Sequence, residues 1–334
     1  MDTSSLEIFN TIPILTGLKN FVKDGSTKGL YLNRSDEATV SAQPAPVFTS
    51  GALGIKEDRL PEILTRLGIR SILLDTEHDL TVLSKLSVIL PPAEVERYPW
   101  PFFRDQTVID ALRALFNNCR TIAFDDWTTI TGASNLWDGL LSDVIKPTGK
   151  NNLEFIFYLG NPTGKLSFEV DEAIDIFSAF SYCGKVTFAL DENEALGLWM
   201  VLNGVQEKLL VEQQSPADLK KKYFSIYKTM DVTRLLIYSA SSAMIISREE
   251  QFVISRKKVD HHVEIGQFAR QNFIAGFSIG LLKDFNIASC LSLGLIIFGY
   301  QGENLSGSER SGIYNYLEKW LEDLHQPESI HLYQ

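Results

Sequence analysis

The sequence predicts an α/β protein whose mostly parallel sheet is covered by helices on both faces. From about residue 105, short apolar runs alternate with segments of helical periodicity. The apolar runs are uninterrupted, which is typical of strands buried on both faces. The chain has 334 residues, of which 45% are hydrophobic and 22% are charged. A chain of this size and composition can bury a large core as one or two globular domains.

The predicted elements follow one another as helix and strand along the chain. Apolar spacing predicts helices over 106–116, 135–145 and 192–205, and one with the buried face Val170, Ala173, Ile174, Phe177 and Phe180. Strands are predicted at 121–124, 155–159, 185–190 and 235–237, and a hairpin at 243–246 and 252–254. Ser215 and Pro216 predict another helix start, because serine caps helices well and proline is tolerated at the first helical position. The last predicted helices lie near 270–283, 287–299 and 308–324.

Charge and cysteine usage exclude several classes of function. The net charge of −11 argues against nucleic acid or an anionic membrane as a partner. The three cysteines are far apart, so we expect small buried hydrophobes rather than disulfides or a zinc site: Cys119, Cys183 and Cys290. The apolar stretch 273–300 is broken at 283–286 into runs too short to span a membrane. With no secretory signal visible, we expect a cytoplasmic protein.

The segment 268–277 carries the strongest functional signal. It reads Phe-Ala-Arg-Gln-Asn-Phe-Ile-Ala-Gly-Phe, which predicts a short loop running into the N-terminus of an apolar helix. A helix N-terminus favours anions because its free N–H groups and its dipole both attract negative charge. Phosphoryl transfer needs such a cradle, a metal near the phosphates and a base near the acceptor hydroxyl.

Several segments resemble the ribokinase-like (PfkB) carbohydrate kinases. Residues 268–277 match the second half of that family's Gly-Ala-Gly-Asp-x-Phe-x-Ala-Gly-Phe signature, and residues 190–195 look like its Asn-x-x-Glu segment. Residues 155–162 are similar to its strand ending in Asp-x-x-x-Pro, and 235–243 stand where it has a strand followed by Thr-x-Gly-x-x-Gly. The resemblance implies a three-layer α/β/α fold with a small β-sheet lid. It also implies phosphate transfer from ATP, with Mg²⁺, to a sugar hydroxyl.

The resemblance assigns an organisation and roles to this chain. We expect one domain over 1–334, with the lid within about 1–104, the core over about 105–300 and a C-terminal helix at 308–324. Three positions fall on the anion hole: Ala269, Arg270 and Asn272. The pair that helps to organise the metal falls on Asp191 and Glu194, and the catalytic base falls on Gln271. Contacts with the nucleotide fall on Ala240, Ser241 and Ala243.

The chain departs from the family where the chemistry would occur. Gln271 has no useful basicity, and loss of a general base typically costs about 10²–10⁴-fold in rate. Phe268 and Arg270 replace two glycines and would crowd a phosphate. Residues 238–243 read Tyr-Ser-Ala-Ser-Ser-Ala, which adds bulk where a nucleotide would lie. The sugar-binding Gly-Gly turn has only a weak counterpart at 51–54.

Some of these features also have purely structural explanations. Asp191 and Glu194 could be first-turn acids that favour a helix dipole. Gly276 could allow close packing of a helix on the sheet, and Arg270 could be a surface arginine. Asp125 and Asp126 follow a strand, and a role in capping a loop is favoured for them. The pair at 261–262, two histidines, predicts no metal site, because adjacent strand residues point to opposite faces.

Three functions stay open. The first is a kinase scaffold without turnover that binds a small sugar or a phosphorylated ligand. The second is an active sugar kinase in which Arg270 stabilises the phosphate and Asp191, Asp125 or Asp126 replaces the base. The third is an interaction protein that oligomerises, for example as a homodimer, through its lid or its aromatic surface. The first is favoured, because several positions of one site are altered together.

Overall fold

One eight-stranded sheet runs through the protein in the order β1-β8-β7-β6-β5-β4-β3-β2. The computed structural model describes residues 7–8, 12–23, 63–64, 66–74, 99–205, 215–239, 242–255, 267–302 and 310–325. The strands are β1 (Glu7–Ile8), β2 (Ile69–Leu74), β3 (Cys119–Asp126), β4 (Leu153–Tyr158), β5 (Gly184–Asp191), β6 (Arg234–Tyr238), β7 (Ser242–Ser247) and β8 (Gln251–Ser255).

Most neighbouring strands in the centre of the sheet are parallel. β3, β4, β5 and β6 are parallel to one another, and β1 is parallel to β8. β7 pairs antiparallel with both β6 and β8, and β2 pairs antiparallel with β3. Every strand of this sheet except β2 and β7 therefore runs in the same direction, as the sequence predicts for a mostly parallel sheet.

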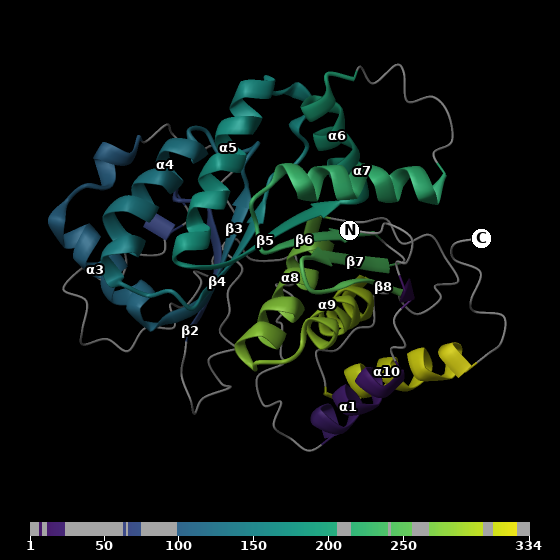
Figure 1. Cartoon of the computed structure of the whole chain (residues 1–334). Coiled ribbons are helices and arrows are strands. Elements are labelled where there is room, and N and C mark those ends of the chain that lie inside the picture. Colours follow the sequence, from purple (N-terminus) through teal and green to yellow (C-terminus); the bar gives the residue numbers. More distant parts are fainter. Residues whose placement is uncertain are drawn as a thin grey trace, which may run out of the picture.

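Helices cover both faces of the sheet and complete three layers (Figure 1). One layer holds α3 (Gln106–Asn118), α4 (Ala133–Leu140), α5 (Ser167–Ala179), α6 (Glu192–Asn203) and α7 (Pro216–Thr229). The other holds α8 (Gln267–Leu282) and α9 (Ile287–Gly302), with α1 (Ile12–Lys23) and α10 (Arg310–His325) side by side beyond them. An ion pair of 2.7 Å joins Lys19 of α1 to Glu318 of α10. The α/β/α class is confirmed.

Alternation along the strands divides the core into two clusters. In β4, Phe155 and Phe157 pack toward α4 and α5, whereas Ile156 and Tyr158 pack toward α8 and α9. Stacked aromatic rings fill the first cluster, including Phe124 on Phe157 at 4.5 Å between centroids. The predicted helix face is buried there as expected: Val170, Ala173, Ile174, Phe177 and Phe180. All three cysteines are buried and free, also as expected.

The α8–α9 hairpin depends on glycines. A Cβ atom at Gly276 would lie 2.6 Å from the Leu293 carbonyl oxygen, and one at Gly280 would lie 2.8 Å from the Cα of Cys290. These positions therefore let two helix backbones approach closely. Helix–sheet packing was one explanation offered for Gly276, and the structure shows that it packs against α9 instead.

The N-terminal hundred residues contribute both edges of the sheet. β1 and β2 were not predicted, and they pair with β8 and β3. The expected lid elements, the turn at 51–54 and the histidines at 261–262 lie outside the described residues, so the lid and the single-domain organisation stay predictions. Among the described residues, no helix is both long and apolar enough to cross a bilayer.

Candidate functional site

The N-terminus of α8 lies at the edge of the sheet where the parallel strands end. Tyr238, the last residue of β6, stacks on Phe273 of α8 with centroids 5.1 Å apart and planes within 10°. Beyond the other end of α8, Asp284 forms an ion pair with Arg120 near the start of β3. These two contacts orient α8 against the direction of the parallel strands. In open α/β sheets, ligands bind outside the carboxyl ends of the strands.

The motif residues lie inside α8 rather than in a loop before it. The helix begins at Gln267, three residues earlier than the sequence analysis placed it. The N–H groups of its first three residues, 267–269, have no partner within the helix. Of the expected anion-hole positions, Ala269 therefore carries an N–H group of the kind that binds an anion, whereas the N–H groups of Arg270 and Asn272, and that of Gln271, fall within the helical ladder. The structure describes only the backbone here, so the side-chain roles stay predictions.

The residues of this segment favour a helical backbone. Glycine costs about 1 kcal/mol in a helix relative to alanine, and it frequently ends helices. This chain instead has Ala269, Arg270 and Gln271, which are all good helix formers. Their helix propensity is consistent with a helix that begins at Gln267.

Asp191 and Glu194 form a reciprocal cap on α6. Asp191 ends β5, and its carboxylate accepts the N–H of Glu194 at 2.8 Å. The Glu194 carboxylate in turn accepts the N–H of Asp191 at 2.9 Å. Glu194 is buried, with 4% of its surface exposed. Desolvation raises the pKa of the adjacent Glu192 carboxyl, and the charge of Asp191 raises it further.

This pair has a clear structural task, and its metal role stays a prediction. Mg²⁺ is commonly held by one or two carboxylates together with substrate phosphates and water. Asp191 is half-buried at the carboxyl edge, where such an ion would meet a phosphate. Among the described residues, no three His, Cys, Asp or Glu side chains come together to hold a metal ion.

The turn between β6 and β7 is closed by its own serines. The N–H of Ser239 donates to the Ser242 carbonyl at 2.8 Å, and the N–H of Ser242 donates to the Ser239 hydroxyl at 3.2 Å. Ala243, expected near a nucleotide, pairs with Tyr238 in the sheet and is buried. The other two expected nucleotide contacts, Ala240 and Ser241, lie outside the described residues.

Asp126 stabilises the turn that follows β3 by hydrogen bonds. Its carboxylate accepts the N–H of Thr128 at 2.9 Å and the Thr128 hydroxyl at 2.5 Å. Gly160 leaves room for this carboxylate, because a Cβ atom there would lie 1.8 Å from its oxygen. Gly160 also has a φ of +78°, which favours glycine. The loop-capping role favoured for Asp126 is confirmed.

Three predicted segments therefore meet at one edge of the sheet. They are the end of β5 with Asp191, the β6–β7 turn after Tyr238, and the start of α8. Sequence reasoning missed the stacking of Tyr238 on Phe273 and the ion pair of Arg120 with Asp284. An acid in place of the usual glycine just after α8 was the available signal for the second.

Comparisons with known proteins concern the fold. No family model matches the chain, and no curated protein is similar to it in sequence. Among solved structures it is similar to adenosine kinase from Sinorhizobium meliloti, at 16% identity and a TM-score of 0.41, over 57% of this chain and 51% of that one. It is also similar to a nucleoside kinase from Methanocaldococcus jannaschii, an archaeal member of the ribokinase family, at 14% identity and a TM-score of 0.37, over 60% and 55%.

A third similar structure is ribokinase from Thermotoga maritima, at 15% identity and a TM-score of 0.36, over 56% of this chain and 59% of that one. The chain thus spans 51%, 55% and 59% of the lengths of these three proteins. Such likeness concerns part of the fold and transfers no residue role. Many of the solved structures similar to this chain are ribokinase-family sugar and nucleoside kinases.

Proposed function

We propose that this protein is a carbohydrate-kinase-like scaffold that binds a small sugar or phosphorylated ligand and has lost efficient phosphoryl transfer. The ligand would lie at the carboxyl edge of the sheet, against the first turn of α8. The N–H groups of residues 267–269 and the helix dipole would bind its phosphate, and the side chain of Arg270 would add positive charge.

One observation carries the proposal. The motif segment is the first part of a continuous helix whose N-terminal half lies toward the carboxyl edge, where Phe273 stacks on Tyr238. The helix supplies an anion site, while Gln271 supplies no base. The chain therefore has a group that can bind a phosphate, the helix N-terminus, but lacks a base at position 271 for phosphoryl transfer.

ATP and Mg²⁺ belong to the active alternative. If they bind, Asp191 and Glu194 would hold the ion, and Mg²⁺ would neutralise charge on the phosphates. The closed serine turn and the capping contacts of Glu194 count against this use. We therefore expect no measurable affinity for ATP–Mg²⁺.

The test combines titration and turnover. Calorimetric titration should show binding of a sugar phosphate, such as fructose 6-phosphate, and no binding of ATP–Mg²⁺. Radiolabelled ATP should transfer no phosphate to a panel of sugars. Transfer that is detected in the natural chain and disappears in Glu194→Ala would overturn the proposal.

An active kinase with relocated groups is the second candidate. It is favoured by the carboxylates of Asp126 and Asp191, which end two strands at the same edge. In that case Asp126→Asn or Asp191→Asn would abolish transfer while the protein remains folded. Assembly as a homodimer is a separate proposal, and light scattering at high concentration would show it.

A further inference from the structure

The turn between α8 and α9 has an unusual residue at its centre. Asp284 has a φ of 54°, and among the described residues it is the only non-glycine with positive φ. The N–H of Phe285 donates to the Gly280 carbonyl at 3.0 Å, which closes the end of α8. Glycine is the usual residue in this position, because other side chains are strained there. An aspartate that keeps such a backbone suggests a task for its side chain.

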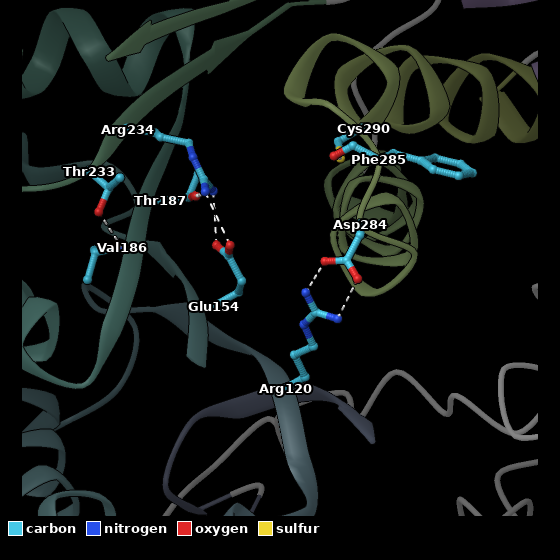
Figure 2. Close-up of polar contacts among 9 residues, drawn as sticks. All are labelled: Arg120, Glu154, Val186, Thr187, Thr233, Arg234, Asp284, Phe285 and Cys290. Carbon is cyan, nitrogen blue, oxygen red and sulfur yellow. Dashed lines mark hydrogen bonds and ion pairs between the residues drawn. The ribbon is translucent and has the colours of Figure 1, made fainter. Parts of the chain in front are cut away.

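The carboxylate of Asp284 reaches across to the sheet. Figure 2 shows it facing Arg120, with two parallel contacts, one of them 3.0 Å from Nη1 to Oδ2. The Arg120 hydrogen bonds and charge lower the pKa of Asp284, and Lys185 adds to the effect. The side chain of Asp284 is 71% exposed, so this pair contributes little to overall stability.

The hairpin packs on a sheet face that is apolar apart from the buried polar group Glu154, Thr187 and Arg234. The backbones of α8 and α9 approach closely at Gly276 and Gly280. Their buried side chains pack on the sheet through residues such as Phe277 and Leu291. Apolar packing has no direction of its own, whereas a two-point ion pair fixes a position along the strand.

We infer that the ion pair of Arg120 with Asp284 is a clasp that sets the position of the α8–α9 hairpin along the sheet. The clasp thereby fixes the first turn of α8 at the carboxyl edge. α8 has 16 residues and spans about 24 Å, so Asp284 acts at the far end of the helix from the motif. Asp284 is thus a positioning residue, and its effect on a ligand rests on the proposed anion site.

Hydrogen exchange tests the clasp without any ligand. Asp284→Asn should raise exchange roughly two- to fivefold, both in a peptide over 283–290 and in one over 267–275, the range expected from a surface ion pair. Asp284→Gly should do the same although it removes the backbone strain. Arg120→Lys, which keeps the charge and loses the fork, should fall between. Asp231→Asn removes another exposed ion pair, with Arg248, and should change neither peptide.

A change confined to 283–290, or no change, would overturn the clasp. Thiol labelling of Cys290 is a second measurement, which applies also to variants that unfold locally around the turn. Cys290 is buried beside the turn, and its Sγ donates to the Phe285 carbonyl at 3.5 Å. In a background with Cys119→Ala and Cys183→Ala, a thiol reagent should label Cys290 faster when Asp284 is replaced. Labelling at an unchanged rate would also count against the clasp.

Titration with inorganic phosphate separates the two proposals. Asp284→Asn should weaken phosphate binding by the same two- to fivefold as the exchange. Equal phosphate affinity in the natural chain and in Asp284→Asn would overturn the positioning role. A natural chain that binds no phosphate, while exchange still responds to Asp284→Asn, would overturn the proposed function and leave the clasp supported.

Discussion

At the carboxyl edge of the sheet, some residues of the expected site have a structural role that the contacts show, and one lacks the group needed for catalysis. Asp191 and Glu194 fall on the Asn-x-x-Glu motif, with Asp191 in place of its asparagine, and both make the contacts of a helix cap. Gln271 matches a catalytic position and lacks the catalytic group. Sequence could locate both positions. It could not show that the two carboxylates bind each other's backbone, because that contact depends on where β5 ends and α6 begins.

Replacing Asp191 should distinguish a cap from a metal ligand. Asp191→Ala should lower the free energy of unfolding by about 1 kcal/mol, because the N–H of Glu194 loses its acceptor. Asp191→Asn should unfold like the natural chain in urea, since asparagine caps a helix equally well. If Asp191→Asn keeps this stability and yet loses an affinity for ATP–Mg²⁺, the carboxylate has a metal role.

Asp143 should make stability depend on pH. Its carboxylate accepts hydrogen bonds from Arg104 at 2.9 Å and from the Trp100 indole at 2.6 Å, and both lower the pKa of Asp143. A lowered folded-state pKa contributes stability above the unfolded-state pKa, and this is lost as pH falls through the folded value. Urea unfolding should therefore show Asp143→Asn less stable than the natural chain at neutral pH, with the difference vanishing in acid. A constant difference at all pH values would contradict this assignment.

Helices and strands were predictable from the sequence where one face of the element is buried. α5 and α7 follow their sequence signals closely, and Ser215 caps α7 by accepting the N–H of Asp218. β2 at 69–74 was missed, because a short edge strand is selected by its partner β3 rather than by its own pattern. The early start of α8 was missed because the family pattern implied a loop, whereas local helix propensity decides the backbone.

The glycines of α8 should be irreplaceable. Gly276→Ala places a methyl group 2.6 Å from the Leu293 carbonyl oxygen, so the helices must separate. Overpacking of this kind typically costs about 1–3 kcal/mol. Gly17→Ala is the matched control, because a Cβ atom there meets nothing within 4 Å and alanine favours a helix. Urea unfolding of both variants should show opposite signs, and a harmless Gly276→Ala would contradict the close packing.

For the molecule as a whole, one buried ion pair connects three strands. Arg234 of β6 binds Glu154 of β4 at 3.0 and 3.2 Å and the Thr187 hydroxyl of β5 at 3.1 Å (Figure 2). Both charged residues are buried beneath α9. The sequence shows the charges, but only the register of the strands brings them together.

Breaking this ion pair should lower the free energy of unfolding strongly. Glu154→Gln leaves Arg234 buried without its counter-charge and should cost about 3–5 kcal/mol, measured by urea unfolding. Glu154→Met with Arg234→Met should be far milder, because both charges leave together. A double variant as unstable as the single one would show that the pair itself, rather than the uncompensated charge, supports the fold.

The outermost strand β1 has a consequence for how the chain folds. β1 lies at residues 7–8 but pairs with β8 at 252–253, so its contact closes a loop of most of the chain. Contacts so distant in sequence form slowly and late. Until β1 arrives, β8 presents an open strand edge on which another chain could add. During synthesis, β1 can therefore pair only after residues 252–253 have been made, and until then the edge of β8 is open.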